Sequence, residues 1–180
     1  MIDFSQSILR KSNDLISKAN SITSTQVEWQ TPITIDCSII STNAKGIDES
    51  HLNKLLAKAD FPALYYFKLV EYQNSRSLLD KLVEFKKTKT HSCPKIDKNR
   101  SIESQYLYVG SVKNNLHGRL IQHLGKGHKL TYSLQLSHWA TELGLKLEYN
   151  YGWIDKQRKD VTELLESALT DTLLPLVGKH

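Results

Sequence analysis

The sequence predicts a single α+β domain, with helices outside an antiparallel or mixed sheet. Three observations predict it. Segments with apolar residues at every second position alternate with segments in which the apolar spacing is helical. The 180 residues have the usual size of one domain, and neither a repeat nor a linker divides them. A composition that is 39% hydrophobic and 24% charged is that of an ordinary globular protein.

The first sixty residues are expected to form an extension packed on the rest of the domain. Residues 4–19 have the spacing of an amphipathic helix, with Phe4, Ile8, Leu15 and Ile16 on one face. Residues 31–40 alternate, which predicts a half-buried strand with Cys37 and Ile39 on its apolar face. A second helix is expected from about residue 48 until it is broken before Pro62.

Residues 61–178 form the expected core. Strands are predicted over 63–72, which is rich in aromatic residues, over 104–111, and over 145–154, which alternates cleanly. Helices are predicted over 75–89, 115–124, 131–143 and 160–174, and their ends are marked by Gly125, Gly144 and Pro175. The stretch 73–103 contains the first of these helices and a polar loop, and forms a basic insertion between two strands.

Composition excludes several classes of protein. The two cysteines, Cys37 and Cys93, lie far apart and form no CxxC pair, which indicates reduced thiols. His91 and Cys93 could begin a zinc site, but no second Cys/His pair completes it. The N-terminus lacks the apolar stretch of a signal peptide, and no segment approaches the ~20 apolar residues that a membrane helix needs. The expectation is a cytoplasmic protein that does not insert into membranes.

Positive charge is concentrated in two segments, although the net charge is only +5. Lys86, Lys87, Lys89, Lys95 and Lys98 lie in the basic insertion, and a second group runs from Lys126 to Lys129. Two interpretations stand side by side. Such lysines often form a solvated surface, but they are also suited to follow the phosphates of a nucleic acid.

A possible phosphate site follows the strand that ends at Gly110. Arg119 and His123 are four residues apart, so they stack on one helix face, at the edge of an apolar stripe that includes Leu120. A guanidinium can hold an oxyanion, and an imidazole in a half-shielded position can move a proton near neutral pH. The alternative is structural, with the arginine stem lying over apolar surface and the histidine packed.

The last helix offers one acidic candidate. Val161, Leu165, Ala168 and Thr172 are expected to form its buried stripe, with Glu166 at the sheltered edge and Glu163 nearer to water. A sheltered carboxylate can bind a hard cation through oxygen. Taken alone, Glu166 favours the alternative interpretation, a plain surface acid.

The order of these features resembles the GIY-YIG nuclease superfamily. The segment "PALYYF" at 62–67 is similar to the first motif strand, and "LYVGS" at 107–111 to the second. The helix "NLHGRLIQH" follows with Arg119 and His123, and "LLESALTDTLLP" carries Glu166. The resemblance covers about residues 60–178. It implies a small three-stranded antiparallel sheet flanked by helices, built from the strands at Ala63, Tyr106 and Leu145.

The resemblance also implies roles for individual residues. Tyr65 and Tyr108 would be the tyrosines of the two motifs, with Tyr65 helping to deprotonate the attacking water. Gly110 would let the chain pass close to the site. Arg119 would contact the scissile phosphate, and His123 would assist proton transfer.

Glu166 would be the single protein ligand of one Mg²⁺ or Mn²⁺. With a DNA substrate, the clustered lysines Lys86, Lys87, Lys89, Lys126 and Lys129 are expected to bind the nucleic acid, as is Gly110. This sequence departs from the family pattern where Ala63 replaces a glycine and where Gly178 stands in place of an asparagine.

The function expected from this resemblance is that of a metal-dependent DNA endonuclease, a stand-alone enzyme of restriction or defence type. Pairing through a sheet edge would make it a homodimer. Two alternatives stay open. One is a catalytically inactive nucleic-acid-binding module on the same fold, and the other is an α/β protein of unrelated function in which the motif order is coincidental.

Overall fold

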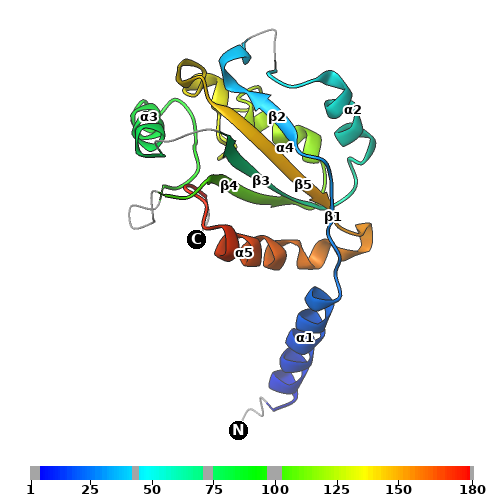
Figure 1. Cartoon of the computed structure of the whole chain (residues 1–180). Helices are drawn as coiled ribbons and strands as arrows, with labels where there is room; N and C mark the ends of the chain where they lie inside the picture. The colour runs from blue at the N-terminus through cyan, green and yellow to red at the C-terminus, as the bar shows by residue number, and fades with distance from the viewer. Residues whose placement is uncertain (1–4, 42–44, 71–74, 97–102, 179–180) are drawn as a thin grey trace.

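The computed structural model describes residues 5–41, 45–70, 75–96 and 103–178, and it confirms an α+β fold (Figure 1). The three expected strands are present as β3 (Ala63–Val70), β4 (Tyr106–Val112) and β5 (Lys146–Trp153). The middle strand β3 pairs antiparallel with both of the others. The register sets Tyr65 opposite Gly110 on one side and opposite Tyr151 on the other.

The sheet has five strands, so the expected count of three is wrong. The N-terminal extension supplies β1 (Glu28–Trp29) and β2 (Ile33–Asp36), and both pair antiparallel with β5. The sheet order is β1-β5-β3-β4, with β2 also bonded to β5, so β4 lies at an edge. The expected strand over 31–40 is shorter than its alternation suggested, because residues Cys37–Ile39 turn into a 3₁₀ helix that leaves Ile39 56% exposed.

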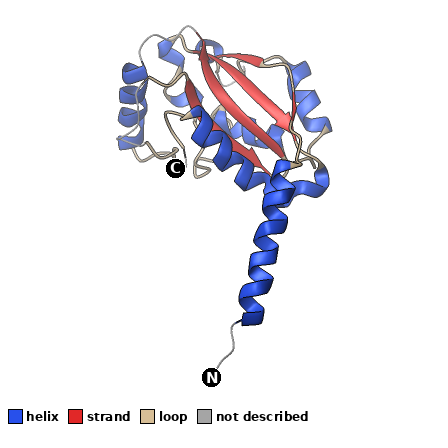
Figure 2. Ribbon diagram, turned by 60° about the horizontal axis from the view of Figure 1, so that its bottom comes forward, coloured by secondary structure: helices blue, strands red, loops and turns tan. Residues whose placement is uncertain are grey.

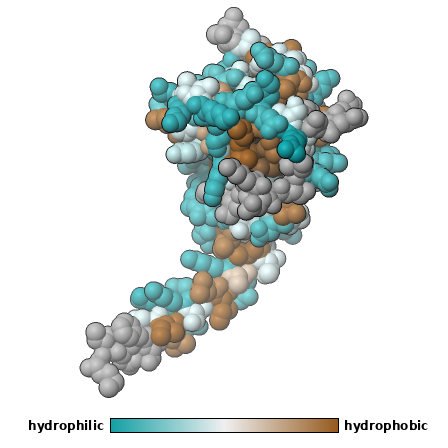
Figure 3. All heavy atoms as spheres, turned by 90° about the vertical axis from the view of Figure 1, so that its left-hand side faces the viewer, coloured by the Kyte–Doolittle hydropathy of each residue, from teal (hydrophilic) through white to brown (hydrophobic). Residues whose placement is uncertain are grey.

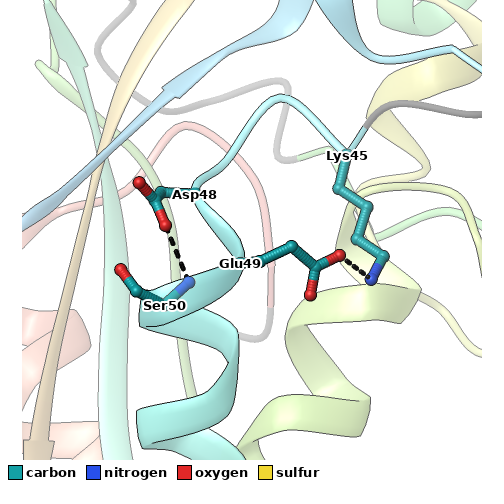
Figure 4. Close-up of polar contacts among 4 residues, drawn as sticks. All are labelled: Lys45, Asp48, Glu49 and Ser50. Atoms are coloured by element: carbon teal, nitrogen blue, oxygen red, sulfur yellow. Dashed lines mark hydrogen bonds and ion pairs between the residues drawn. The ribbon is translucent and has the colours of Figure 1, made fainter.

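Local sequence signals account for the second helix, α2 (Glu49–Ala57). The carboxylate of Asp48 accepts a hydrogen bond of 2.7 Å from the backbone N–H of Ser50, which satisfies one of the donors that every helix start leaves unpaired. Glu49, in the first turn, forms an ion pair of 2.9 Å with Lys45 (Figure 4). The capping aspartate therefore fixes the start of the helix at the residue where it was expected.

The helices α4 (Leu116–His123) and α5 (Thr162–Leu173) cover opposite faces of the sheet. The faces differ because side chains alternate along a strand. Ala63, Tyr65 and Phe67 point toward one face, and α4 places its buried residues Leu116 and Leu120 in the same core. The helix α5 packs against β4 and β3, below the sheet in Figure 1, and α3 (Ser75–Lys87) lies at one end.

Residues 131–143 do not form the expected helix. They form two short 3₁₀ segments, Leu136–His138 and Thr141–Leu143, joined by irregular backbone. Tyr132 and Gln135 have φ values of 49° and 56°, which a continuous right-handed helix cannot accommodate. The helical spacing was misleading because this segment is held by contacts with α4, including a bond from the Leu134 N–H to His123.

The first helix, α1 (Ser5–Thr23), extends away from the body (Figures 1 and 2). Its apolar side chains Ile8, Leu9, Leu15 and Ile16 are between 58% and 68% exposed. Of the described part of the extension, β1, β2, the 3₁₀ helix Cys37–Ile39 and α2 pack with the body, and α1 contacts the 3₁₀ segment Lys156–Val161. Within the described part of the chain, no helix has the length and apolar character needed to cross a membrane.

Candidate active site

The candidate site is built around the edge strand β4, at Gly110. Tyr65 lies opposite Gly110 in the register, and its ring passes directly over the glycine. A Cβ atom placed on Gly110 would lie 2.5 Å from the Tyr65 hydroxyl and 2.8 Å from a ring carbon of Tyr108. Real Cβ atoms do not approach other heavy atoms so closely. Only glycine therefore lets the two tyrosines converge here, and their rings stack with centroids 6.1 Å apart.

A chain of hydrogen bonds fixes the protonation of His123. The backbone N–H of Leu134 donates to His123 Nδ1 over 3.1 Å, so this nitrogen carries no proton. In the neutral ring the proton is then on Nε2, which lies 3.0 Å from the Tyr65 hydroxyl oxygen. His123 thus donates to Tyr65, and its ring orientation is determined from the other side by the main chain.

Arg119 joins the same tyrosine to the rest of the site. Its Nε–H donates to the Tyr65 oxygen over 3.1 Å, and one Nη2 proton points to the Tyr108 oxygen over 3.4 Å. The other contacts of the guanidinium are Gln122 Oε1 and the carbonyls of Thr131 and Tyr132. A guanidinium has five N–H donors, so the protein engages all of them. The two longest bonds, both 3.4 Å, are made by Nη2.

The electrostatics of this cluster follow from its burial. Tyr65 is 1% exposed, and burial followed by the nearby Tyr108 raises its pKa well above the ordinary value, although Arg119 acts in the opposite direction. Burial, reinforced by the charge of Arg119, lowers the pKa of His123 well below its ordinary value. Tyr65 is accordingly protonated and His123 neutral at physiological pH.

Glu166 reaches β4 from the other side of the sheet. Its carboxylate accepts a hydrogen bond of 2.5 Å from the hydroxyl of Ser111, whose side chain points to the face opposite Gly110. The charge of Glu166 contributes to the raised pKa of Tyr65, so the two groups are electrostatically coupled around the edge strand. Glu163, one turn away, is exposed and forms an ion pair of 2.9 Å with Lys113.

The structure therefore brings Tyr65, Tyr108, Arg119 and His123 together, with Glu166 at the same strand. Two details of the expected placement are wrong. His123 is not half-shielded at a helix edge but 0% exposed, because residues 131–136 cover the end of α4. Ala168 and Thr172 are exposed, because α5 turns Leu165, Glu166 and Leu169 toward the sheet instead.

The lysines expected to bind DNA lie in the last turn of α3 and in two loops that meet. The backbone N–H of Ser92, in the basic insertion, donates to the carbonyl of Lys129 over 2.8 Å. Lys87, Lys89 and Lys95 are exposed, whereas Lys86 is half-buried and bonds to the Pro94 carbonyl. Lys126 bonds to the Ser41 carbonyl, and Lys98 lies outside the described residues. Since Thr131 contacts Arg119, the loop containing Lys129 leads directly to the site.

Four participating residues were missed in the sequence. Gln122 sits one turn after Arg119, a spacing that signals contact on a helix. Ser111 follows Gly110 directly, and alternation alone would have turned it to the opposite face. The carbonyls of Thr131 and Tyr132 had no signal, because a backbone contact across twelve residues depends on the loop conformation.

His91 and Cys93 do not form a metal site. Across the described ranges, no group of three or more His, Cys, Asp or Glu side chains is arranged to hold an ion. His91 instead packs against His138, with ring centroids 4.2 Å apart, and both rings contact Phe85. A single carboxylate with ordered waters is a different kind of site, and the half-buried oxygens of Glu166 are ligands of the type that Mg²⁺ prefers.

The edge of the sheet next to the site is partly occupied by the chain itself. The N–H groups of Leu176 and Val177 donate to the carbonyls of Tyr106 and Leu107, over 2.8 Å and 3.1 Å. This bonding covers the part of β4 that precedes Gly110. A second copy could not add a strand at these residues without displacing the C-terminal segment.

Comparison with known proteins gives no relative: no protein-family model, no curated protein and no solved structure matches this chain significantly.

Proposed function

We propose that this protein is a metal-dependent endonuclease that hydrolyses phosphodiester bonds of DNA, in a restriction or defence role. One observation carries the proposal. Two tyrosines, an arginine and a histidine from three separate elements converge over a glycine at which any Cβ atom would overlap the Tyr65 hydroxyl and ring, and a carboxylate approaches the same strand. A packing core does not require that combination of side chains. Phosphate cleavage uses a cation to hold the phosphate, a proton acceptor and an oxygen ligand for metal.

The residues would divide the chemistry as follows. Arg119 would present Nη2 to a phosphate oxygen, because this nitrogen makes the two weakest contacts in the protein. Tyr108, at 8% exposed, is the more accessible phenol and would handle the proton of the attacking water. Tyr65 is buried and remains protonated, so it would position Arg119 rather than act as the base. His123 would hold Tyr65 in turn.

Glu166 would hold the divalent cation, with Ser111 fixing the carboxylate through its hydroxyl. A bound Mg²⁺ or Mn²⁺ would supply charge stabilisation at the phosphate. The contribution of the protein would be to hold the carboxylate in place through Ser111 while Arg119 binds the phosphate.

The decisive experiment is plasmid nicking by the purified chain, with and without added Mg²⁺. Glu166→Gln keeps an acceptor for Ser111 but removes the charge that a hard cation needs, so cleavage should be abolished while the thermal melt is unchanged. Glu163→Gln is the matched control on the same helix and should cleave normally. If Glu166→Gln cleaved DNA at the wild-type rate, Glu166 would not be the metal ligand.

A second candidate function is a nucleic-acid-binding module without catalysis. The observation in its favour is that Arg119 already has all five donors engaged. In that case the purified chain shifts DNA in a gel but never nicks it, with Mg²⁺ or Mn²⁺ present, and Glu166→Gln changes neither result.

Both candidates require a surface for the phosphate backbone, and the exposed lysines Lys87, Lys89 and Lys95 provide a test of it. Replacing all three with Ala should weaken DNA binding and reduce the slope of log affinity against log salt by ~0.9 for each phosphate that is no longer neutralised. An unchanged slope would assign these lysines to the solvated surface. The cleavage rate at saturating DNA should hardly change, because none of the three contacts the cluster at Gly110.

A further inference from the structure

The helix α1 carries an apolar face that nothing in the described chain covers. Ile8, Leu9, Leu15 and Ile16 are 62%, 58%, 68% and 59% exposed. Figure 3 shows apolar atoms along the helix that projects from the body. In proteins most of the stability of a helix comes from packing of its apolar face rather than from helix propensity. The apolar face of α1 therefore indicates that packing against a partner stabilises this helix.

The face has an internal symmetry about Ser12. The sequence from Ile8 to Ile16 is Ile-Leu-Arg-Lys-Ser-Asn-Asp-Leu-Ile, so its four apolar residues form a palindrome centred on Ser12. Leu9 and Leu15 lie three residues either side of the centre, and Ile8 and Ile16 lie four. At about 100° per residue, all four side chains fall within roughly 60° of the direction of Ser12.

We propose that α1 is a dimerisation helix that pairs antiparallel with α1 of a second copy of this chain, with the twofold axis at Ser12. A twofold axis makes both copies use the same patch. In this arrangement Ile8 packs against the partner's Ile16, and Leu9 against the partner's Leu15. The small side chain of Ser12 lets the helices approach at the centre. A groove on an unrelated protein would not require the palindrome.

The direction of pairing follows from where the bodies lie. Each body begins just after Thr23, at one end of a helix that is about 28 Å long. An antiparallel pair places the two bodies at opposite ends, where they do not compete for space. A parallel pair would put both bodies at the same end and bring Lys11 against the partner's Lys11.

The interface is small, which predicts its strength. Four large apolar side chains from each copy fall below the 1,200 Å² or so that a stable interface buries, so the dimer should dissociate on dilution. Charged side chains do not interrupt the contact: Arg10 and Asp14 lie about 160° from Ser12, on the far side of the helix.

The test is disulfide crosslinking combined with sedimentation. The native thiols of Cys37 and Cys93 are 0% and 6% exposed, so mild oxidation reports the introduced cysteine. Ser12→Cys should crosslink two copies efficiently. Ile8→Cys should not crosslink to itself but should crosslink when mixed with Ile16→Cys. The matched control, Asp14→Cys on the far side, should form no disulfide-linked dimer.

Sedimentation should show the wild-type chain passing from monomer to dimer between about 1 μM and about 100 μM, a range typical of weak association. The double variant Ile8→Ser, Leu15→Ser should remain a monomer throughout, with the fold of the body intact by circular dichroism. A wild-type monomer at the highest concentration would overturn the proposal. Self-crosslinking of Ile8→Cys as efficient as that of Ser12→Cys would overturn the antiparallel pairing.

Discussion

The helices α1 and α4 show what a sequence pattern can and cannot decide. Both have apolar residues at helical spacing and basic residues beside them, and both are helical in the structure. In α4 the apolar stripe is buried at 0% exposure, and Arg119 and His123 are bound to side chains of β3 and β4. In α1 the stripe faces outward. Spacing predicts the helix, whereas the surroundings decide whether its polar residues form a site.

Truncating one leucine in each helix should produce the largest difference. Leu120→Ala removes a side chain that is 0% exposed and leaves a cavity, so we expect it to lower the free energy of unfolding by about 2–5 kcal/mol. Leu15→Ala should change it by less than about 0.5 kcal/mol in the monomer, because Leu15 is 68% exposed. Urea denaturation of dilute protein measures both. Equal losses would show that α1 packs on the body in solution.

Gly110→Ala tests the convergence of the tyrosines. The new methyl group would overlap the ring of Tyr65, which is held by His123 and Arg119 and cannot move aside cheaply. We expect a loss of about 1–3 kcal/mol in the free energy of unfolding, together with loss of any nicking activity. Ser12→Ala in α1 is the comparison, since it adds no overlap and raises helix propensity. If Gly110→Ala is as stable as wild type, the close approach at β4 is looser than described.

The same substitution at two neighbouring tyrosines should have opposite effects. Tyr65→Phe leaves the Arg119 Nε–H and the His123 Nε2–H without their acceptor, so we expect a loss of about 1–3 kcal/mol. The hydroxyl of Tyr149 is buried without a hydrogen-bond partner in the described structure. Tyr149→Phe should therefore raise the free energy of unfolding by about 1 kcal/mol. Thermal melts of the two variants provide the comparison, and a destabilising Tyr149→Phe would reveal a partner for that hydroxyl.

The burial of His123 should make stability depend on pH. Because its pKa is lowered on folding, the unfolded chain takes up the proton more readily than the folded one. The contribution to stability is fully present above the unfolded pKa of about 6.5 and is lost as pH falls from there toward the folded pKa. His123→Asn keeps an acceptor for the Leu134 N–H and should reduce this slope. Identical slopes in denaturation series from pH 7 down to pH 5 would contradict the assignment.

Several elements were predictable because their signals are local. Aromatic and β-branched content together with alternation located β3, β4 and β5 to within a few residues, and Asp48 fixed the start of α2. The spacing of Arg119 and His123 placed both on one helix, and Gly110 was expected to allow a close approach. The two-residue strand β1 carries too short a pattern to be recognised, and β2 was expected as a strand but not as a partner of β5.

The segment 131–143 illustrates why the rest could not be predicted. Its spacing favours a helix, but Tyr132 and Gln135 adopt left-handed backbone conformations. They do so because contacts with α4 stabilise the segment more than a continuous helix would. That choice buries His123 and occupies the donors of Arg119, so it decides the chemistry of both residues. No local sequence pattern predicts this conformation, because its stability depends on the balance between backbone strain and contacts with distant segments.

By itself the sequence determined the approximate positions of β3, β4, β5 and most of the helices, that a glycine follows Tyr108 by two residues, and that α1 has a face symmetric about Ser12. Only the tertiary structure decided that Tyr65 is the more deeply buried tyrosine and that Glu166 reaches β4 from the face opposite Tyr65. It also decided that the apolar face of the projecting helix stays exposed within the described chain. The physical reason is that periodicity and capping act within a few residues of the chain, whereas burial and hydrogen-bond partners depend on how distant segments pack together.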